Sequence, residues 1–223
     1  MRYYPAFLDL TEKRCLVAGA GDVGRRKLAT LIKCPVKEVL VVDPGPPHTD
    51  LEPLIAPVNV TYANRPFTDS DLEGCFLAIA ATAKTEVNQR IADLCRERSI
   101  LCNVIDEPDS GDFIVPAHVD LDGLVAALSS SGVSPALTRV VRRDLQEYLG
   151  SRYTILLALL KKLRPLVLAL EQPQADNAAL FRSLVTSDLA GLLSSGDQQG
   201  AQALLQEILP PALADHIPEL LAG

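Results

Sequence analysis

The sequence contains no Trp, and aromatic residues make up only 4% of its 223 residues. The core must therefore be built mainly from Leu, Val, Ile and Ala. Basic residues are outnumbered by acidic ones, and the formal net charge is −7 at pH 7. This balance argues against general nucleic-acid binding, because such binding draws its affinity from many contacts between Lys or Arg and phosphates. It leaves room for a local basic pocket.

The cysteines lack the spacing of a metal site. No two of them form a Cys-x-x-Cys pair, and no His lies near them at a metal-ligand spacing, so we expect no zinc site and assign no metal. Most of them lie in apolar runs or on the apolar side of an expected helix. We therefore interpret them as buried, reduced thiols. They are Cys15, Cys34, Cys75, Cys95 and Cys102.

Long uninterrupted apolar runs are also missing. Residues 1–5 do not begin an apolar segment of the kind found in signal peptides. The most apolar later stretch, residues 154–170, is broken by Lys161, Lys162 and Arg164, so it does not predict a transmembrane span. We expect a cytoplasmic protein with no membrane partner.

Strands and helices alternate in the first half of the chain. Apolar runs predict buried strands, and apolar residues at helical spacing predict the segments between them as helices, with Thr85 as the N-cap of the second. This alternation predicts a Rossmann-like, doubly wound parallel α/β sheet over residues 1–112. The expected strands are 14–19, 36–43, 59–62, 75–81 and 100–105, and the expected helices are 23–33 and 85–98.

The pattern changes after residue 112. Segments 113–119 and 124–129 are joined by Asp120-Leu121-Asp122-Gly123, which predicts a hairpin. Ser134-Pro135 then predicts an N-cap and first turn of a helix that ends near Leu149. We expect a small α+β region over 113–149 and an all-α region over 150–223. Breaks in the latter are expected at Pro173, Gly196 and Pro210-Pro211.

The segment Gly19-Ala20-Gly21-Asp22-Val23-Gly24 is a G-x-G-x-x-G motif placed directly between an expected strand and an expected helix. In this setting Gly19 allows a tight turn, Gly21 lets the backbone approach a pyrophosphate, and Gly24 lets the helix pack close to the strand. The helix N-terminus offers free amides to the phosphates. The alternative is a glycine-rich turn with no ligand.

Asp43 lies nineteen residues after Gly24, at the end of the second expected strand. An acid at this position accepts hydrogen bonds from the ribose hydroxyls and repels a 2′-phosphate. We therefore expect NAD rather than NADP as the cofactor.

Asp106 ends an expected strand at the carboxyl edge of the sheet, where doubly wound folds bind their ligands. A carboxylate there can accept a proton or orient a substrate nitrogen. It can equally be a cap or turn residue before Pro108, and position alone does not separate the two interpretations.

A hydroxyl-rich loop, Ser129 to Ser134, leads into the expected helix at Pro135. Such a helix N-terminus suits carboxylates or phosphates, although simple capping by Ser134 explains the pattern equally well. The segment that follows is rich in cations, and this indicates an anionic ligand or partner. The cations are Arg139, Arg142, Arg143, Arg152, Lys161, Lys162 and Arg164.

Several segments together match a known family in its order and spacing over residues 3–149. The chain resembles the precorrin-2 dehydrogenase module of siroheme biosynthesis, which occurs alone or as the N-terminal part of siroheme synthase. The matching segments are 4–10, 17–24 with Arg26-Lys27, 77–82, 87–89, 102–106, 113–116 and 129–135.

The resemblance implies oxidation of precorrin-2 to sirohydrochlorin in siroheme (tetrapyrrole) biosynthesis, with hydride transfer to NAD. It implies a catalytic role for Asp106 and a homodimer whose interface lies after the Rossmann domain, within 113–149. It also implies NAD contacts at four positions, to which we add Thr82 and Asn103 from the matching segments. The four positions are Asp22, Val23, Asp43 and Pro44.

Precorrin-2 carries many carboxylates, so an acidic enzyme needs a local cationic site to hold it. Arg139, Arg142 and Arg143 are the candidates, together with the hydroxyls of Ser130 and Ser134. Two features depart from the family: Ser131 stands where many members carry a second glycine, and the segment after Ala169 matches no known element.

The sequence leaves two alternative functions open. A bifunctional enzyme would also insert iron or cobalt into sirohydrochlorin, with Asp106 helping to deprotonate the pyrrole nitrogens. An NAD-sensing regulatory module would bind the nucleotide without catalysis, but it gives no reason for the serine loop and the arginines.

Overall fold

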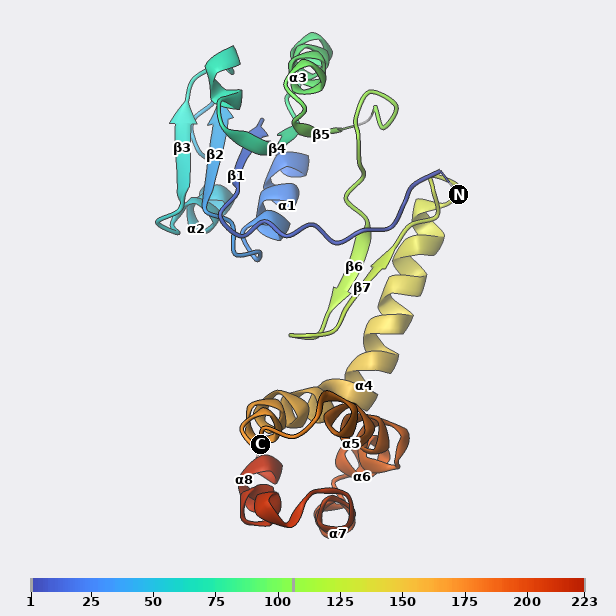
Figure 1. Cartoon of the computed structure of the whole chain (residues 1–223). Coiled ribbons are helices and arrows are strands. Elements are labelled where there is room, and N and C mark those ends of the chain that lie inside the picture. The colour runs from blue at the N-terminus through green and yellow to red at the C-terminus, as the bar shows by residue number, and fades with distance from the viewer. Residues whose placement is uncertain (1, 106, 223) are drawn as a thin grey trace. The chain divides into compact units, whose positions relative to one another are not determined.

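The computed structural model describes residues 2–105 and 107–222, and these residues form two units that meet in sequence between Val115 and Pro116 (Figure 1). The first unit contains the parallel sheet. The second contains a hairpin and the remaining helices.

The first unit is built on a five-stranded parallel sheet with the strand order β3-β2-β1-β4-β5. The chain moves outward from β1 to β3, returns to the other side of β1, and continues to β5. The expected doubly wound sheet is therefore confirmed, with its switch point between β1 and β4, where such folds bind ligands. The strands are β1 (Arg14–Ala18), β2 (Glu38–Asp43), β3 (Val60–Asn64), β4 (Cys75–Ala80) and β5 (Leu101–Val104).

Helices cover both faces of this sheet, which is why its central strands are apolar over most of their length. Alternate side chains of β1 enter different cores: Val17 packs toward α1 and α2, whereas Leu16 packs toward α3. The first face carries α1 (Asp22–Leu31), η1 (Thr49–Leu51) and α2 (Glu52–Ile55). The second face carries η2 (Asp69–Leu72) and α3 (Thr85–Glu97).

The expected N-cap at Thr85 is wrong. Lys84 occupies the N-cap position without a capping side chain, and Thr85 is the first helical residue. The chain turns earlier than expected because the Thr82 hydroxyl accepts a hydrogen bond from the Lys84 amide at 3.2 Å.

The second unit begins with the expected hairpin, formed by β6 (Ala117–Asp120) and β7 (Val125–Leu128), which pair antiparallel. The Leu121 amide donates to the Leu124 carbonyl at 3.1 Å across the turn. Both central residues have positive φ, 52° at Asp122 and 127° at Gly123. An Asp-Gly pair suits such a turn, since Asp and Gly tolerate this conformation.

Helix α4 (Pro135–Leu168) is 34 residues long. Its start is confirmed, because Ser134 is the N-cap and Pro135 is the first helical residue. The expected end near Leu149 is wrong: the helix continues through Gly150, where an added Cβ would meet no atom within 4 Å. Glycine there costs helix propensity, but the apolar residues beyond it pack into a core and keep the segment helical.

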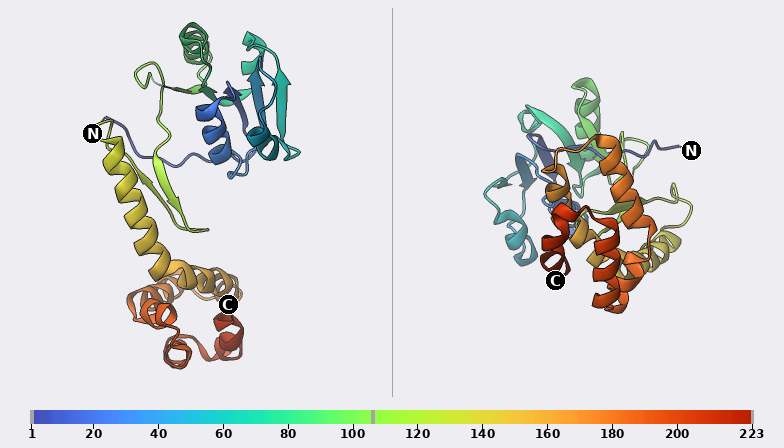
Figure 2. Two further views of the ribbon diagram at one scale, coloured as in Figure 1. Left: turned by 180° about the vertical axis from the view of Figure 1, so that it is seen from behind. Right: turned by 60° about the horizontal axis from the view of Figure 1, so that its bottom comes forward.

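The second half of α4 packs with the shorter helical segments that follow it around one apolar core (Figure 2). The expected breaks at Pro173, Gly196 and Pro210-Pro211 separate some of these segments, with Gly196 in a left-handed C-cap at φ 78°. A further break at Ser187-Asp188 was not predicted. Among the residues that the structure describes, no helix combines the length and apolar character needed to cross a membrane. The segments are α5 (Gln174–Thr186), α6 (Leu189–Ser195), α7 (Gln198–Ile208), η3 (Pro211–His216) and α8 (Ile217–Leu221).

Candidate functional site

The loop from Gly19 to Gly24 connects β1 to α1 at the switch point of the sheet. Gly19 has φ +98°, and a Cβ there would lie 2.2 Å from the Ala81 carbonyl oxygen. Its amide donates to the Val42 carbonyl at 2.8 Å, which anchors the turn to the end of β2. Both the backbone angle and the close contact require glycine at this position.

Gly24 and Gly21 differ in what surrounds them. A Cβ on Gly24 would lie 2.0 Å from the Gly19 carbonyl oxygen, so glycine lets α1 pack directly against the turn. A Cβ on Gly21 would meet nothing within 4 Å. The fold therefore gives no packing reason for glycine at residue 21, whereas close approach of a bound pyrophosphate does.

The first turn of α1 presents free backbone donors beside Gly21. The first backbone hydrogen bond of the helix runs from the Arg25 amide to the Gly21 carbonyl at 2.9 Å. The amides of Asp22, Val23 and Gly24 consequently have no intrahelical acceptor. The exposed Asp22 carboxylate forms an ion pair with Arg25 at 2.5 Å. Because a carboxylate repels a phosphate, Asp22 would contact the phosphate through its backbone amide.

Asp43 ends β2 and holds the glycine loop in place. Its Oδ2 accepts from the Ala20 amide at 2.7 Å, and its Oδ1 accepts from the Gly45 amide at 2.7 Å. A carboxylate has about four acceptor positions, so two remain for ribose hydroxyls. The predicted ribose acceptor thus also positions the phosphate loop. Pro44 follows it at the surface and begins the exposed turn.

Tyr62 on β3 supports the turn after Asp43. Its hydroxyl donates to the Gly45 carbonyl at 2.5 Å, and the Asn64 amide group donates to the Asp43 carbonyl at 3.1 Å. Partial burial, followed by the nearby Asp43 carboxylate, raises the pKa of Tyr62. The phenol therefore stays protonated as a donor.

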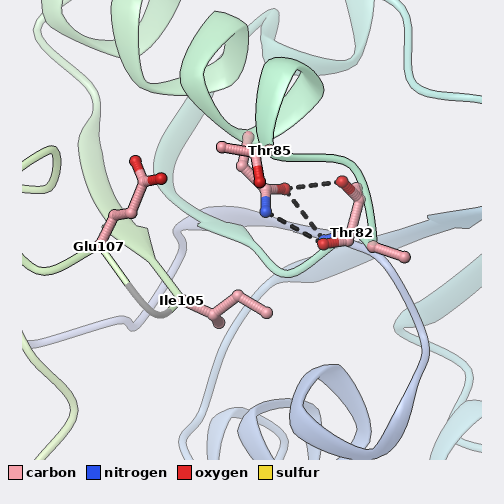
Figure 3. Close-up of a pocket in the computed structure, with 6 residues that line it drawn as sticks. Thr82, Thr85, Ile105 and Glu107 are labelled. Carbon is pink, nitrogen blue, oxygen red and sulfur yellow. Dashed lines mark hydrogen bonds between the residues drawn. The ribbon is translucent and has the colours of Figure 1, made fainter.

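A cavity of about 200 Å³ lies beyond the carboxyl ends of β4 and β5 (Figure 3). Its polar wall includes Thr82 from the turn after β4 and Thr85 and Asn88 from the start of α3. Ile105 and Glu107 come from the segment after β5. Asp43 ends β2, on one side of β1 in the sheet, whereas this cavity lies at the ends of β4 and β5, on the other side of β1. Adenosine and nicotinamide halves of a dinucleotide bind on the two sides of such a switch point.

Asn88 fixes the wall formed by Thr82. The buried Asn88 side chain accepts from the Thr82 amide at 3.0 Å and from its hydroxyl at 2.7 Å, and it donates to the Thr82 carbonyl at 3.0 Å (Figure 3). These bonds hold Thr82, a predicted cofactor contact, in one conformation. Asn88 was not among the predicted site residues, although it lies in one of the segments that matched the family.

Asn103 lies within β5 and is 5% exposed. Its Nδ2 donates to the Phe113 carbonyl at 2.9 Å, whereas its buried Oδ1 has no hydrogen-bond partner among the described residues. Nearby, the Asp112 carboxylate accepts from the Cys102 amide at 2.9 Å. These hydrogen bonds hold residues 112 and 113 against β5. The prediction that Asn103 contacts the cofactor remains a proposal.

Asp106, the predicted catalytic residue, lies outside the described residues. The residues before and after it in the sequence, Ile105 and Glu107, both line the cavity. The Ile105 amide donates to the Ala80 carbonyl at 3.0 Å. Glu107, which sequence analysis missed, carries no signal in the sequence beyond its position next to Asp106.

The predicted serine loop lies in the second unit. The Ser134 hydroxyl accepts from the Leu137 amide at 3.2 Å, and the Ser130 hydroxyl accepts from the Ser134 amide at 3.1 Å. Ser134 is therefore a helix cap. Neither hydroxyl donates to another described residue, so both retain a proton for an anionic ligand.

Ser131 adopts φ 52° and Gly132 φ 87°, and the Val133 amide donates to the Ser130 carbonyl at 3.0 Å. Both residues thus occupy the left-handed region that favours glycine. This turn gives the physical reason for a second glycine in the resembled family.

Arg139, Arg142 and Arg143 follow the serine loop on α4, and their spacing of three and four residues places them on one side of the helix. Arg142 donates to Gln146 at 2.8 Å, and Arg143 lies 3.5 Å from the Asp144 carboxylate. Arg139 is exposed and makes no ion pair with any described residue. This side of α4 remains strongly cationic.

The cysteine thiols lie in the two apolar cores of the first unit or pack against them. Cys15, Cys95 and Cys102 are buried, while Cys34 and Cys75 are half-buried. Burial raises the pKa of Cys15 to about 12, so its thiol is protonated. Within residues 2–105 and 107–222, no three His, Cys, Asp or Glu side chains gather in a way that could bind a metal ion.

The chain is similar over nearly its whole length to curated siroheme synthases. The chain is 32% identical over 213 residues to a siroheme synthase of Thioalkalivibrio sulfidiphilus, covering 96% of this chain and 43% of that protein. It is 31% identical over 227 residues to a siroheme synthase of Enterobacter sp., covering 100% of this chain and 49% of that protein. The chain thus spans less than half the length of these curated relatives.

A solved structure of "SirC, precorrin-2 dehydrogenase" has the same fold, with a TM-score of 0.75 at 22% identity over 92% of this chain and 98% of that one. The sequence model of a family described as "Putative NAD(P)-binding" matches residues 6–117, half of the chain. These residues include the glycine loop, Asp43 and the cavity. The chain belongs to this NAD(P)-binding family.

Proposed function

We propose that this protein is an NAD-dependent dehydrogenase that oxidises precorrin-2 to sirohydrochlorin. The observation that carries the proposal is a dinucleotide cradle, with Gly21 open to a ligand, on a chain that matches siroheme synthases over 96–100% of its length. The likeness in fold to a precorrin-2 dehydrogenase supports the same substrate.

Asp43 supports NAD rather than NADP as the cofactor. Its carboxylate occupies the end of β2 and is held by the amides of Ala20 and Gly45, so it stays beside the glycine loop. A 2′-phosphate brought there would face a fixed negative charge. The ribose hydroxyls of NAD can instead donate to it.

Different residues bind the cofactor and assist the oxidation. The amides of the first turn of α1 bind the pyrophosphate, Asp43 binds the ribose, and Thr82, held by Asn88, shapes the nicotinamide side. NAD, when bound, accepts the hydride that leaves a substrate carbon. We propose that Asp106 accepts the proton released in the same oxidation or orients the macrocycle for it.

The cationic side of α4 can bind an anionic substrate even though the protein as a whole carries a net negative charge. Arg139, Arg142 and Arg143 can form charge-assisted hydrogen bonds with the substrate's carboxylates. The Ser130 and Ser134 hydroxyls retain protons that can be donated to the same groups. We assign these five residues to substrate binding.

We also propose a homodimer that uses the apolar side of α4. Several large apolar residues of this helix are exposed in the single chain, among them Leu137 at 57%, Tyr148 at 55% and Ile155 at 52%. Val141, Tyr148 and Ile155 recur every seven residues, as in a helix–helix seam. A second copy would bury this seam, and a sedimentation experiment that finds only monomers would refute this part.

Anaerobic incubation with precorrin-2 and NAD⁺ tests the proposed activity. We expect the sirohydrochlorin absorption spectrum to develop only when NAD⁺ is present. An Asp106→Asn variant should bind NAD⁺ normally but turn over much more slowly, while the nearby Asp109→Asn variant serves as the matched control. Tight NAD⁺ binding without any turnover by the unmodified protein would instead indicate a nucleotide-sensing module.

A further inference from the structure

Glu107 is the single carboxylate among the described residues that line the cavity beyond β4 and β5. The remaining lining residues are Thr82, Ala83, Thr85, Asn88 and Ile105, which carry no charge. In Figure 3 the Glu107 carboxylate lies on one side of the cavity, and Thr82 and Thr85 lie on the other. Among the described lining residues, a ligand in this cavity therefore meets one negative charge and otherwise uncharged groups.

The Glu107 side chain is held in position from its own loop. The Ser110 hydroxyl lies 3.3 Å from Glu107 Oε2 and 3.3 Å from the Gln89 side-chain oxygen on α3. The Ser110 amide donates to the Glu107 carbonyl at 3.0 Å. No Lys, Arg or His forms an ion pair with Glu107 among the described residues, so its charge is not neutralised by the protein.

The position of the cavity identifies which part of a dinucleotide enters it. Asp43 and the glycine loop take the adenosine ribose and the pyrophosphate on the β2 side of the switch point. The other half of the molecule must then extend toward β4 and β5, where this cavity lies. That half ends in the nicotinamide ring, which is positively charged in NAD⁺ and neutral in NADH.

We propose that Glu107 is a specificity-determining residue that favours the oxidised nucleotide, NAD⁺, over NADH. This inference rests on the proposed function, since it takes the cavity as the nicotinamide end of the cofactor site. The carboxylate attracts the charged ring before the reaction, and this attraction disappears when the ring becomes neutral. The same residue thus favours binding of the oxidant and release of the reduced product.

The test compares equilibrium binding of NAD⁺ and NADH, measured by calorimetry without any tetrapyrrole. Glu107→Gln keeps the shape and removes the charge. We expect it to weaken NAD⁺ binding by about fivefold, the size of a single-charge interaction at a partly exposed site, and to leave NADH binding within about twofold. Glu107→Asp keeps the charge and should retain most of the preference for NAD⁺.

Glu97→Gln is the matched control, because it makes the same chemical change at the far, exposed end of α3. It should change neither constant. Equal weakening of both nucleotides by Glu107→Gln, or no weakening of either, would overturn the role of Glu107 while leaving the proposed function intact. Failure of the unmodified protein to bind NAD⁺ would instead overturn both.

Discussion

Substitution of Gly21 and Gly24, the last two glycines of the loop, by alanine separates a ligand role from a packing role. Gly21→Ala places its Cβ in open space, so we expect the unfolding free energy to change by less than about 1 kcal/mol. Gly24→Ala places its Cβ 2.0 Å from the Gly19 carbonyl oxygen and 2.9 Å from its carbonyl carbon. Both atoms belong to the backbone, so α1 must move away from β1.

The expected cost of Gly24→Ala is about 3 kcal/mol, at the upper end for overpacking a tight contact. That corresponds to a melting temperature lower by roughly 10 °C. Gly21→Ala should keep its melting temperature but lose stabilisation by NAD⁺, which for the unmodified protein at a concentration of about 100 Kd amounts to roughly 2.7 kcal/mol.

Thermal unfolding with and without NAD⁺ measures both effects in one assay. Gly150→Ala is the control, because its Cβ also meets nothing within 4 Å but lies in α4 of the second unit. It should raise stability by about 0.5–1 kcal/mol and leave the shift caused by NAD⁺ unchanged. A Gly21→Ala variant that NAD⁺ stabilises as strongly as the unmodified protein would refute the assignment of this loop to the pyrophosphate.

Three further predictions concern single side chains. Asp43→Asn places a side-chain N–H opposite the backbone N–H of Ala20 or Gly45, so one hydrogen bond is replaced by a repulsive contact. We expect the affinity for NAD⁺ to fall about tenfold and the preference for NAD⁺ over NADP⁺ to decrease. Titrations with both nucleotides measure these changes. Arg139→Gln should raise KM for precorrin-2 about threefold without changing the Kd of NAD⁺, whereas the exposed Arg182→Gln control should change neither. Burial raises the pKa of Asp71, but hydrogen bonds from Arg65 and Thr68 outweigh it and hold that pKa below its ordinary value of 3.8. This carboxylate therefore stabilises the fold above pH 3.8, and its contribution is lost as the pH falls further. Asp71→Asn should lower the free energy of unfolding at pH 7. In acid titrations, the free energy of unfolding of this variant should fall less steeply with decreasing pH than that of the unmodified protein. An equally steep fall would contradict this role.

The first unit was predictable because its signals are local. An apolar run, a glycine motif and a second apolar run ending in Asp43 specify β1, α1 and β2, with little dependence on distant residues. The hairpin was predictable for the same reason, since Asp122-Gly123 favours the tight turn observed.

The errors arose where packing overrides local preference. Gly150 is a poor helix former, yet α4 continues through it because Leu156, Leu159 and Leu163 are buried in the helical core. The hydrogen bonds between Asn88 and Thr82, and the cavity bordered by Glu107, depend on chain segments that only the fold brings together. No periodic pattern in the sequence encodes such contacts.

The ratio of the two products in a single turnover tests the central proposal most directly. With enzyme in excess over precorrin-2, and with NAD⁺ present under anaerobic conditions, one NADH should form for each sirohydrochlorin. Both should appear at the same rate, because a single hydride transfer produces them. Sirohydrochlorin formed without NADH, or NADH formed without sirohydrochlorin, would contradict the proposal.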